Sequence, residues 1–423
     1  PPAANGEALA KRLRNTDEGG QPTLRIPNEK EFGELQKRFG FHRPPEMADW
    51  QWQRVRELYQ LGGSANAFPD TIEGYKDWVD GILSTQPRRW EGFDAANQLA
   101  LVYKYRDALP PYAIDHWRLY WEAWLMCHRE TRELVHPQYH QIWTKWRGLG
   151  SDYYDRTGDW RGNYSFYRAG YTRIISTMNF NHTAAVGALL GGAFIGCDRA
   201  VEDGRFGLED FPLRLWAWYD GTSQESIDHY YLSHTLHAQK MFADFGPTPF
   251  DRMMGESILA KNVDELASCH HPGLKRFIST ALRTTPFYAL QTQEGVQHIV
   301  HSLSREGALT DTDKVGRQAE RMRNKEVNAF PILGHDLSPR RVAVQACNRP
   351  WGPDWMARVV DDKPLPFAMT ATWRQWGAFR EYPKWKKIYM GRHYGVASFD
   401  LNSSPTINLM GMWKRTRPPV PSA

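Results

Sequence analysis

A chain of 423 residues with 41% apolar and 24% charged side chains can bury a sizeable core, which excludes a wholly disordered protein. No apolar run approaches the roughly 20 residues that a membrane-spanning helix needs, so we expect no membrane span. The net charge of +5 suits an anionic partner, although an ordinary surface with more Lys and Arg than Asp and Glu has the same charge. The 18 Trp and 19 Tyr mostly fill the core, and some can form flat platforms for sugar rings.

The ends of the chain and its cysteines bear on its location. The chain opens at Pro1 without Met or an apolar leader, as a secreted protein does after its signal peptide is removed and as an excised piece also does. The four cysteines contain no CxxC pair, so disulfides and buried free thiols both stay open. We expect a secreted or periplasmic protein with an N-terminal arm at 1–27 and a tail or linker at 416–423.

Residues 28–329 read as successive helices with short, punctuated connections. In the segment 113–127, Trp117, Tyr120 and Trp124 recur at three- and four-residue steps, which is a helical period. Gly, Ala and other small residues dominate 184–194, so this helix lets neighbouring backbones come close and is expected to be interior. The predicted helices are 29–39, 46–61, 71–83, 90–109, 113–127, 137–146, 164–177, 181–194, 225–244, 255–267, 273–283 and 311–325.

Residues 330–415 differ from the helical pattern before them and are predicted to form short strands. The predicted strands are 341–346, 367–372, 387–390 and 407–412. Antiparallel helical hairpins can curl into a ring, so we predict a mainly α protein, an (α/α) toroid of roughly six or seven helix pairs over 28–329. The strands of 330–415 would form a small antiparallel β segment packing on the toroid. A helical solenoid is the competing arrangement.

Asn181 and His182 are adjacent at a predicted helix start, where both side chains can reach the same space. An amide beside an imidazole suits the elimination of a uronic acid. The proton at C5 is weakly acidic because the neighbouring carboxylate resists a second negative charge, and hydrogen bonds to that carboxylate relieve the repulsion. A base must then reach the proton, and an acid must protonate the leaving glycosidic oxygen. The alternative is that Asn181 merely caps the helix and His182 is an ordinary polar residue.

The segment 224–234 supplies a phenol for that reaction. Tyr230 or Tyr231 is the expected proton donor, because positive charge nearby lowers the pKa of a phenol. One face of the predicted helix carries Tyr230, His234, His237 and Met241. The alternative interpretation of this face is an ordinary amphipathic helix with exposed histidines. The substrate-binding candidates of this segment are Gln224, Glu225, His229 and His234.

Two further segments carry candidate substrate-binding residues. The polar, aromatic-rich loop 148–163 contains Trp160 and Arg161. Arg392, His393 and Tyr394 stand between glycines in a strand-turn setting that suits a loop facing the substrate. The alternative for this second segment is an ordinary hairpin turn with exposed polar residues.

Four short motifs follow one another along the chain: Asn181-His182, Asp220-Gly221, Glu225 and Tyr230-Tyr231. This pattern resembles the toroidal polysaccharide lyases that act on alginate, glucuronan and heparin-like chains, and among them the alginate and glucuronan lyases of polysaccharide lyase family 38 are similar in size. The resemblance implies that the Asn-His pair binds and neutralises the uronate while a Tyr serves as acid, or as both acid and base. Several of those lyases carry an Arg shortly before the Tyr, and this chain has none there. The cation would then come from Arg168, Arg173, Arg283 or Arg392.

The function predicted from the sequence is therefore a lyase for a (1→4)-linked uronic-acid polymer, with an acidic polysaccharide as partner and neither nucleic acid nor membrane. An inverting glycoside hydrolase needs two carboxylic acids about 6.5–9.5 Å apart. Its candidates, Glu225 with Asp220 or Asp228, crowd one short stretch, which argues against it. A non-catalytic glycan-binding protein is the other alternative.

No cofactor is expected, because the histidines and cysteines have no diagnostic metal-ligand spacing. Zinc or calcium is the less favoured alternative, with His234, His237 and the run Cys269-His270-His271 as possible ligands.

Overall fold

The structure is a computed structural model that describes residues 41–61, 178–198, 231–279, 294–310, 339–373, 384–399 and 409–414. It also describes single positions at 30, 34, 99, 102–104, 106, 114, 118, 201, 202, 204, 205 and 208. At 178–184, 188, 231, 294, 373 and 384 the description covers the backbone alone.

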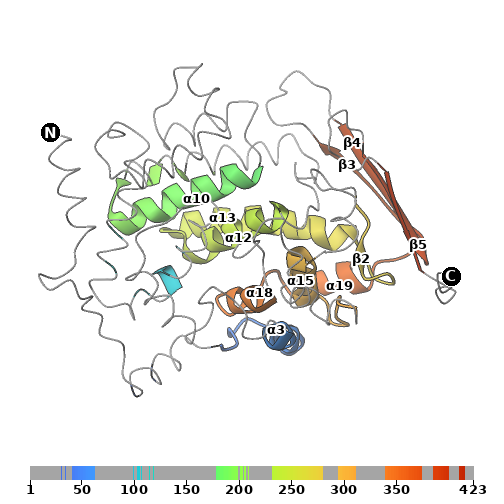
Figure 1. Cartoon of the computed structure of the whole chain (residues 1–423), viewed down its shortest axis with the longest axis horizontal. Helices are drawn as coiled ribbons and strands as arrows, with labels where there is room; N and C mark the ends of the chain where they lie inside the picture. The colour runs from blue at the N-terminus through green and yellow to red at the C-terminus, as the bar shows by residue number, and fades with distance from the viewer. Residues whose placement is uncertain are drawn as a thin grey trace, which may run out of the picture.

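Three helices lie side by side in one layer: α10 (Met178–Ile195), α12 (Tyr231–Phe245) and α13 (Pro249–Cys269) (Figure 1). Helix α13 begins with a capping box, in which the Thr248 hydroxyl accepts from the backbone N–H of Asp251 and the Asp251 carboxylate accepts from that of Thr248. Pro249 occupies the first helical turn, where its missing N–H costs nothing. The backbones of α12 and α13 approach closely at Gly255, where a Cβ would lie 2.6 Å from the amide nitrogen of Ala243.

Four shorter helices form a second layer: α3 (Asp49–Leu61), α15 (Glu294–Leu303), α18 (Pro339–Ala346) and α19 (Met356–Asp361). Helix α3 packs on α18 and α15, and α19 packs on α13 and α15. The Trp351 ring is buried beside this layer and donates from Nε1 to the carbonyl oxygen of Val342. One continuous hydrophobic core therefore runs between the two helical layers.

Four strands follow: β3 (Phe367–Trp373), β4 (Lys384–Met390), β5 (Tyr394–Phe399) and β6 (Leu409–Trp413). They form an antiparallel sheet in the order β3-β4-β5-β6, which lies beyond the end of α13 (Figure 1). Side chains alternate across it, so Ile388, Met390 and Ala397 are buried against the helices while the neighbouring positions face outward. A short hairpin of β1 (His270–His271) and β2 (Arg276–Phe277) lies between α13 and this sheet.

Most predicted elements that fall in the described part are confirmed. Helices occupy most of 46–61 and all of 181–194, 231–244 and 255–267, and strands occupy 367–372, 387–390 and 409–412. Residues 30, 34, 99, 102–104, 114 and 118 are helical, as predicted for their segments. The predicted helices 71–83, 137–146, 164–177 and 311–325 lie outside the described residues. Closure of the helices into a toroid stays a prediction, because most of residues 62–177 lie outside the description as well.

Two predicted elements are wrong. The predicted strand 341–346 belongs to helix α18, because Arg341 to Ala346 are all buried and a segment buried on every side has no distinctive period. The predicted helix 273–283 is a turn followed by β2 over its described part, 273–279. There the His271 ring accepts hydrogen bonds from the backbone N–H groups of Gly273 and Leu274, and Lys275 adopts a positive φ of 51°. These features are incompatible with a helix. Helices α15 and α19 and strand β5 were not predicted.

The described cysteines, Cys197, Cys269 and Cys347, are free thiols, and Cys127 lies outside the described residues. None of the helices that the structure describes is both long and apolar enough to cross a membrane.

Candidate functional site

Helices α10 and α12 run in the same direction. Tyr103 contacts both of them in their C-terminal halves: its hydroxyl donates to the Leu190 carbonyl oxygen at 2.7 Å, and its ring centroid lies 5.7 Å from that of Phe245. The two helices also pack extensively against each other. If they were antiparallel with these C-terminal positions side by side, they would overlap only near their C-terminal ends, so the helices are parallel. The first turns of two helices that are distant in sequence therefore lie at one end of the layer.

Helix α13 returns along α12 in the opposite direction. Gly255 of α13 faces Ala243 of α12. Further toward the end of α13, and one turn nearer the start of α12, Nδ2 of Asn262 donates to Oε1 of Gln239 at 3.0 Å. Continued at the same pairing, this brings the first turn of α12 beside the last turn of α13, which ends at Cys269. We call the region where these helix ends meet the β1–β2 hairpin the hairpin end.

A buried histidine connects the hairpin end to the sheet. Nδ1 of His271 accepts from the backbone N–H groups of Gly273 and Leu274, at 3.1 and 3.2 Å. The proton is therefore on Nε2, which donates to the carbonyl oxygen of Gly391 at 2.8 Å. Because both ring nitrogens are bonded, His271 fixes the turn 391–393, which carries two of the predicted substrate-binding residues, against the hairpin.

Lys363 satisfies carbonyl groups at the C-terminal end of α13. Its Nζ donates to the carbonyl oxygens of Ala267 at 2.8 Å, Ser268 at 2.8 Å and His270 at 2.6 Å. Burial lowers the pKa of Lys363 to about 8. The partial negative charge of a helix C-terminus favours the cation, so the ammonium both caps α13 and adds positive charge to the hairpin end.

Lys386 attaches strand β4 to the same helix. Its Nζ lies 3.2 Å from Oε1 of Glu265 and 3.5 Å from Sγ of Cys269, with both charged side chains buried. Burial disfavours the charge of Lys386, but Cys269 and Glu265 outweigh it and raise its pKa. Burial also raises the pKa of the Cys269 thiol. This ion pair is a buried polar link between the sheet and α13.

Basic side chains gather at the hairpin end. Burial, and then the positive charge of neighbours that include Lys363 and Arg276, lowers the pKa of the buried His270 imidazole well below its ordinary value. That ring is therefore neutral and lies edge-on to Phe277. A positive potential of this kind attracts and stabilises an anionic group. The basic residues of this end are Lys275, Arg276, Lys363 and Arg392.

The predicted catalytic residues are described in part. The backbone of Asn181 and His182 lies in the first turn and a half of α10, and Tyr231 is the first residue of α12. Their side chains lie outside the described part, as does the whole of Tyr230. The predicted substrate-binding residues Trp160, Arg161, Gln224, Glu225 and His229 also lie outside it, and so do the alternative cations Arg168, Arg173 and Arg283.

The remaining predicted residues have described side chains. Arg392, His393 and Tyr394 are exposed at the turn between β4 and β5 and at the start of β5. His234 is buried in α12, as are His237 and Met241 on the same face. The amphipathic alternative with exposed histidines is therefore wrong: every residue from Leu232 to Ala243 is buried. The small side chains of α10 and Gly255 of α13 let these helices enclose α12, and so no face of α12 is left for solvent.

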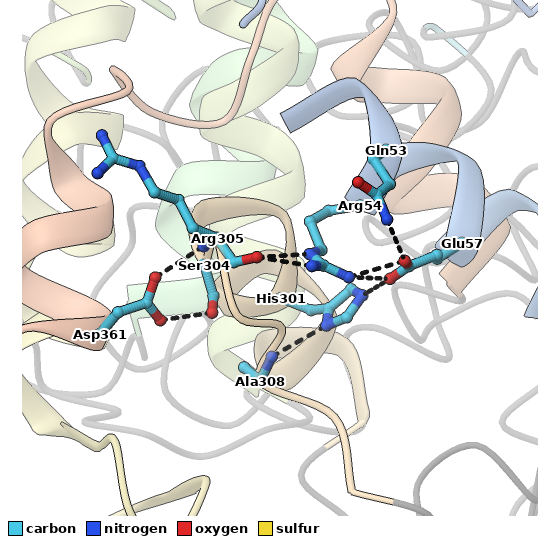
Figure 2. Close-up of polar contacts among 8 residues, drawn as sticks. All are labelled: Gln53, Arg54, Glu57, His301, Ser304, Arg305, Ala308 and Asp361. Carbon is cyan, nitrogen blue, oxygen red and sulfur yellow. Dashed lines mark hydrogen bonds and ion pairs between the residues drawn. The ribbon is translucent and has the colours of Figure 1, made fainter. Parts of the chain in front are cut away.

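Figure 2 shows a second polar cluster, which joins α3, α15 and the loop after α15. Nε2 of His301 donates to Oε2 of Glu57 at 3.0 Å, and Nδ1 accepts from the backbone N–H of Ala308 at 3.0 Å. Arg54 donates to both Glu57 oxygens at 2.7 Å and to the Arg305 carbonyl oxygen. Burial lowers the pKa of His301 to about 4, so the ring is neutral. With both nitrogens bonded within the protein, His301 has no lone pair for a substrate, and the cluster serves to hold the helices together.

Comparisons with protein-family models, with curated proteins and with solved structures find no match to this chain. No three His, Cys, Asp or Glu side chains are grouped as metal ligands within the described ranges.

The basic residues of the hairpin were missed by sequence reasoning. Lys275 and Arg276 lie in a segment predicted as helix, and the signal that marks the turn is the dipeptide Pro272-Gly273. Lys363 gave no such signal, because its role depends on the distant end of α13.

Proposed function

We propose that this protein is a polysaccharide lyase that cleaves a (1→4)-linked uronic-acid polymer, such as alginate or glucuronan, by β-elimination. The observation that carries the proposal is the parallel packing of α10 and α12, whose N-terminal ends contain Asn181-His182 and Tyr231 and share one end of the layer. An active site assembled from these two segments requires that arrangement.

The surroundings of this end suit the chemistry. Asn181 and His182 would hydrogen-bond the uronate carboxylate and disperse the charge that develops when the C5 proton is removed. The basic side chains of the hairpin end, Arg276 and Arg392 among them, favour an anionic sugar there. They are candidates for the cation that the segment before Tyr230 does not supply.

The reaction balances without a cofactor. A base, either His182 or a tyrosinate, takes the C5 proton, and the electron pair forms the C4–C5 double bond as the C4–O bond breaks. Tyr230 or Tyr231 protonates the leaving oxygen, so the products are a new chain end and an unsaturated uronate.

Ultraviolet absorbance of the unsaturated uronate tests the proposal directly. The protein is incubated with alginate, glucuronan, heparin and pectin, and we expect absorbance to rise with at least one of them. Tyr230→Phe or Tyr231→Phe should lower kcat by about 10²–10⁴, the usual contribution of a general acid or base. Asn181→Ala should lower it by about 10²–10³.

Tyr59→Phe is the matched control, because it removes a phenol hydroxyl from α3 in the other helical layer. It should keep its activity. Full activity of both Tyr230→Phe and Tyr231→Phe, or no absorbance change with any of the four polymers, contradicts the proposal. New reducing ends without absorbance would identify a hydrolase instead.

A further inference from the structure

The outer face of the four-stranded sheet carries a cluster of exposed aromatic side chains. Tyr394 of β5 pairs directly with Trp413 of β6, and the Tyr389 ring lies diagonally beside Tyr394 with centroids 5.9 Å apart. Trp385 projects from the same face of β4, four residues before Tyr389. Exposure ranges from 43% for Tyr389 to 75% for Trp413, so these rings contribute little to the core. We call this surface the aromatic face.

Large apolar side chains in this number are unusual on a solvent-facing sheet and mark an interaction surface. Val396 and Leu409 extend the aromatic face across β5 and β6, with Leu409 69% exposed. The alternation is clear on β4 alone, where Trp385, Lys387 and Tyr389 are exposed while Lys386 and Ile388 are buried.

The charge of the aromatic face is positive. Lys387 lies between Trp385 and Tyr389 and is paired in register with Thr370 and Ser398. Lys414 follows Trp413 at one edge. No outward-facing residue of the four strands is acidic within the described positions. A partner that fits must therefore present both flat apolar patches and negative charge.

A second copy of this chain does not meet that requirement. In a symmetric dimer the same surface meets itself, so both halves of the interface would carry the positive charge of Lys387 and Lys414 and neither would supply a negative charge. A chain of uronic-acid residues fits better. Each sugar offers an apolar ring face for stacking on Trp or Tyr, and each carboxylate offers a partner for Lys387.

The aromatic face is also continuous with the hairpin end. Tyr389 and Tyr394 flank the turn 391–393, which carries Arg392 and His393 and is held to the hairpin by His271. A polymer lying across the rings would therefore reach the basic side chains of the hairpin end.

From these observations we infer that the aromatic face, built on Trp385, Tyr389, Tyr394 and Trp413 around Lys387, is a binding surface for an anionic polysaccharide chain. The inference rests on the proposed function only in its choice of a uronic-acid polymer as the anionic glycan. It adds an anchoring surface on the sheet to a site formed by helix ends.

Binding is measured on the whole chain by affinity gel electrophoresis and titration calorimetry, in the Tyr230→Phe/Tyr231→Phe background so that turnover does not interfere. The probes are alginate, polyglucuronate, a soluble neutral glucan and a single-stranded thymidine oligonucleotide. Trp413→Ala and Trp385→Ala should each weaken uronate binding about tenfold, and together more. Lys387→Gln should weaken it about threefold and reduce its dependence on salt.

Trp355→Ala is the matched control, because this Trp is 53% exposed but lies at the start of α19, away from the sheet. It should bind as the parent does. Circular dichroism checks that each variant is folded, which the high exposure of Trp413 makes the expected result.

Parent-like binding by Trp413→Ala and Trp385→Ala together overturns the inference. Equal affinity for the neutral glucan contradicts the inference that the surface selects an anionic chain. Binding of the oligonucleotide alone identifies a nucleic-acid surface instead. The outcomes for the two proposals are separable. Unsaturated product from the parent chain, together with unchanged binding by the face variants, retains the lyase and refutes the binding surface. Face-dependent binding with no unsaturated product from the parent chain retains the binding surface and refutes the lyase.

Discussion

At the residue scale, the described part of the protein buries several histidines in their neutral form. His237 in α12 accepts a hydrogen bond at Nδ1 from Gln345, and burial lowers its pKa to about 3. His301 is held between Glu57 and the Ala308 N–H, with a pKa of about 4. Each contributes a dependence of stability on pH, because an unfolded chain protonates its histidines near pH 6.5.

The direction of that dependence follows from the depressed pKa values. Above pH 6.5 neither the folded nor the unfolded state protonates His301, so its contribution is constant. As the pH falls from 6.5 to about 4 the unfolded state gains a proton that the folded state refuses, and the free energy of unfolding falls by up to roughly 3 kcal/mol. His237 extends the loss to about pH 3.

We therefore predict that His301→Gln is less stable than the parent at pH 7 and that the difference shrinks as the pH falls to 4. The variant loses hydrogen bonds at every pH, but it has no imidazole to protonate in the unfolded state. Urea unfolding at pH 7, 5.5 and 4.5 measures both free energies. A difference that stays constant or widens on acidification would show that His301 is not held neutral.

At the element scale, the close packing of α12 and α13 depends on a helical glycine. Ala is ordinarily the better helix former, by about 1 kcal/mol. At Gly255, however, a Cβ would lie 2.6 Å from the amide nitrogen and 2.8 Å from the Cα of Ala243. Neither is part of a movable side chain, so the helices themselves must separate.

Gly255→Ala is accordingly expected to lower the free energy of unfolding by about 1–3 kcal/mol, the usual range for overpacking, despite its gain in helix propensity. Gly411→Ala is the control, because a Cβ there meets nothing within 4 Å on strand β6. It should be neutral or slightly stabilising. Chemical denaturation of the two variants decides the matter, and equal effects would mean that α12 and α13 are further apart than described.

At the scale of the whole molecule, the sheet and the helical layers share one core and one buried ion pair. Ile278 of the hairpin fills the space beside Gly395 of β5, where a Cβ would lie 2.5 Å from it. Lys386 reaches from β4 to Glu265 in α13. The sheet is thus part of the cooperative unit, and its turn is held in place relative to the hairpin end.

Breaking that ion pair tests the coupling. Lys386→Met leaves Glu265 buried without its cation, which should cost about 3–5 kcal/mol. The double variant Lys386→Met/Glu265→Gln removes both charges and should recover much of the loss. For each variant, tryptophan fluorescence and far-ultraviolet circular dichroism should report the same unfolding midpoint. An additive double variant would rule out a direct coupling between the two residues.

Elements with a strong local pattern were predictable without the tertiary structure. The small-residue segment of α10 was expected as an interior helix, and strands β3, β4 and β6 were expected near their observed positions. The segment 341–346 was not, since Val342, Ala343 and Val344 suit a strand as well as a buried helix. The two-residue strands of the hairpin are too short to give any period.

For the candidate site, the sequence supplied the chemistry of Asn181, His182 and the paired tyrosines, and it pointed to the exposed turn with Arg392. It did not reveal Lys275, Arg276 and Lys363, because Lys363 joins the two hairpin residues only when its ammonium reaches the distant end of α13.

The sequence by itself therefore determined which segments are helices and strands wherever side chains repeat with a clear period, because that pattern reflects one buried and one exposed face. Only the tertiary structure decided that α12 is enclosed on all sides, that its start shares an end of the layer with the start of α10, and that basic side chains gather where α13 meets the β1–β2 hairpin. These properties depend on contacts between residues far apart in the chain, which no local pattern encodes.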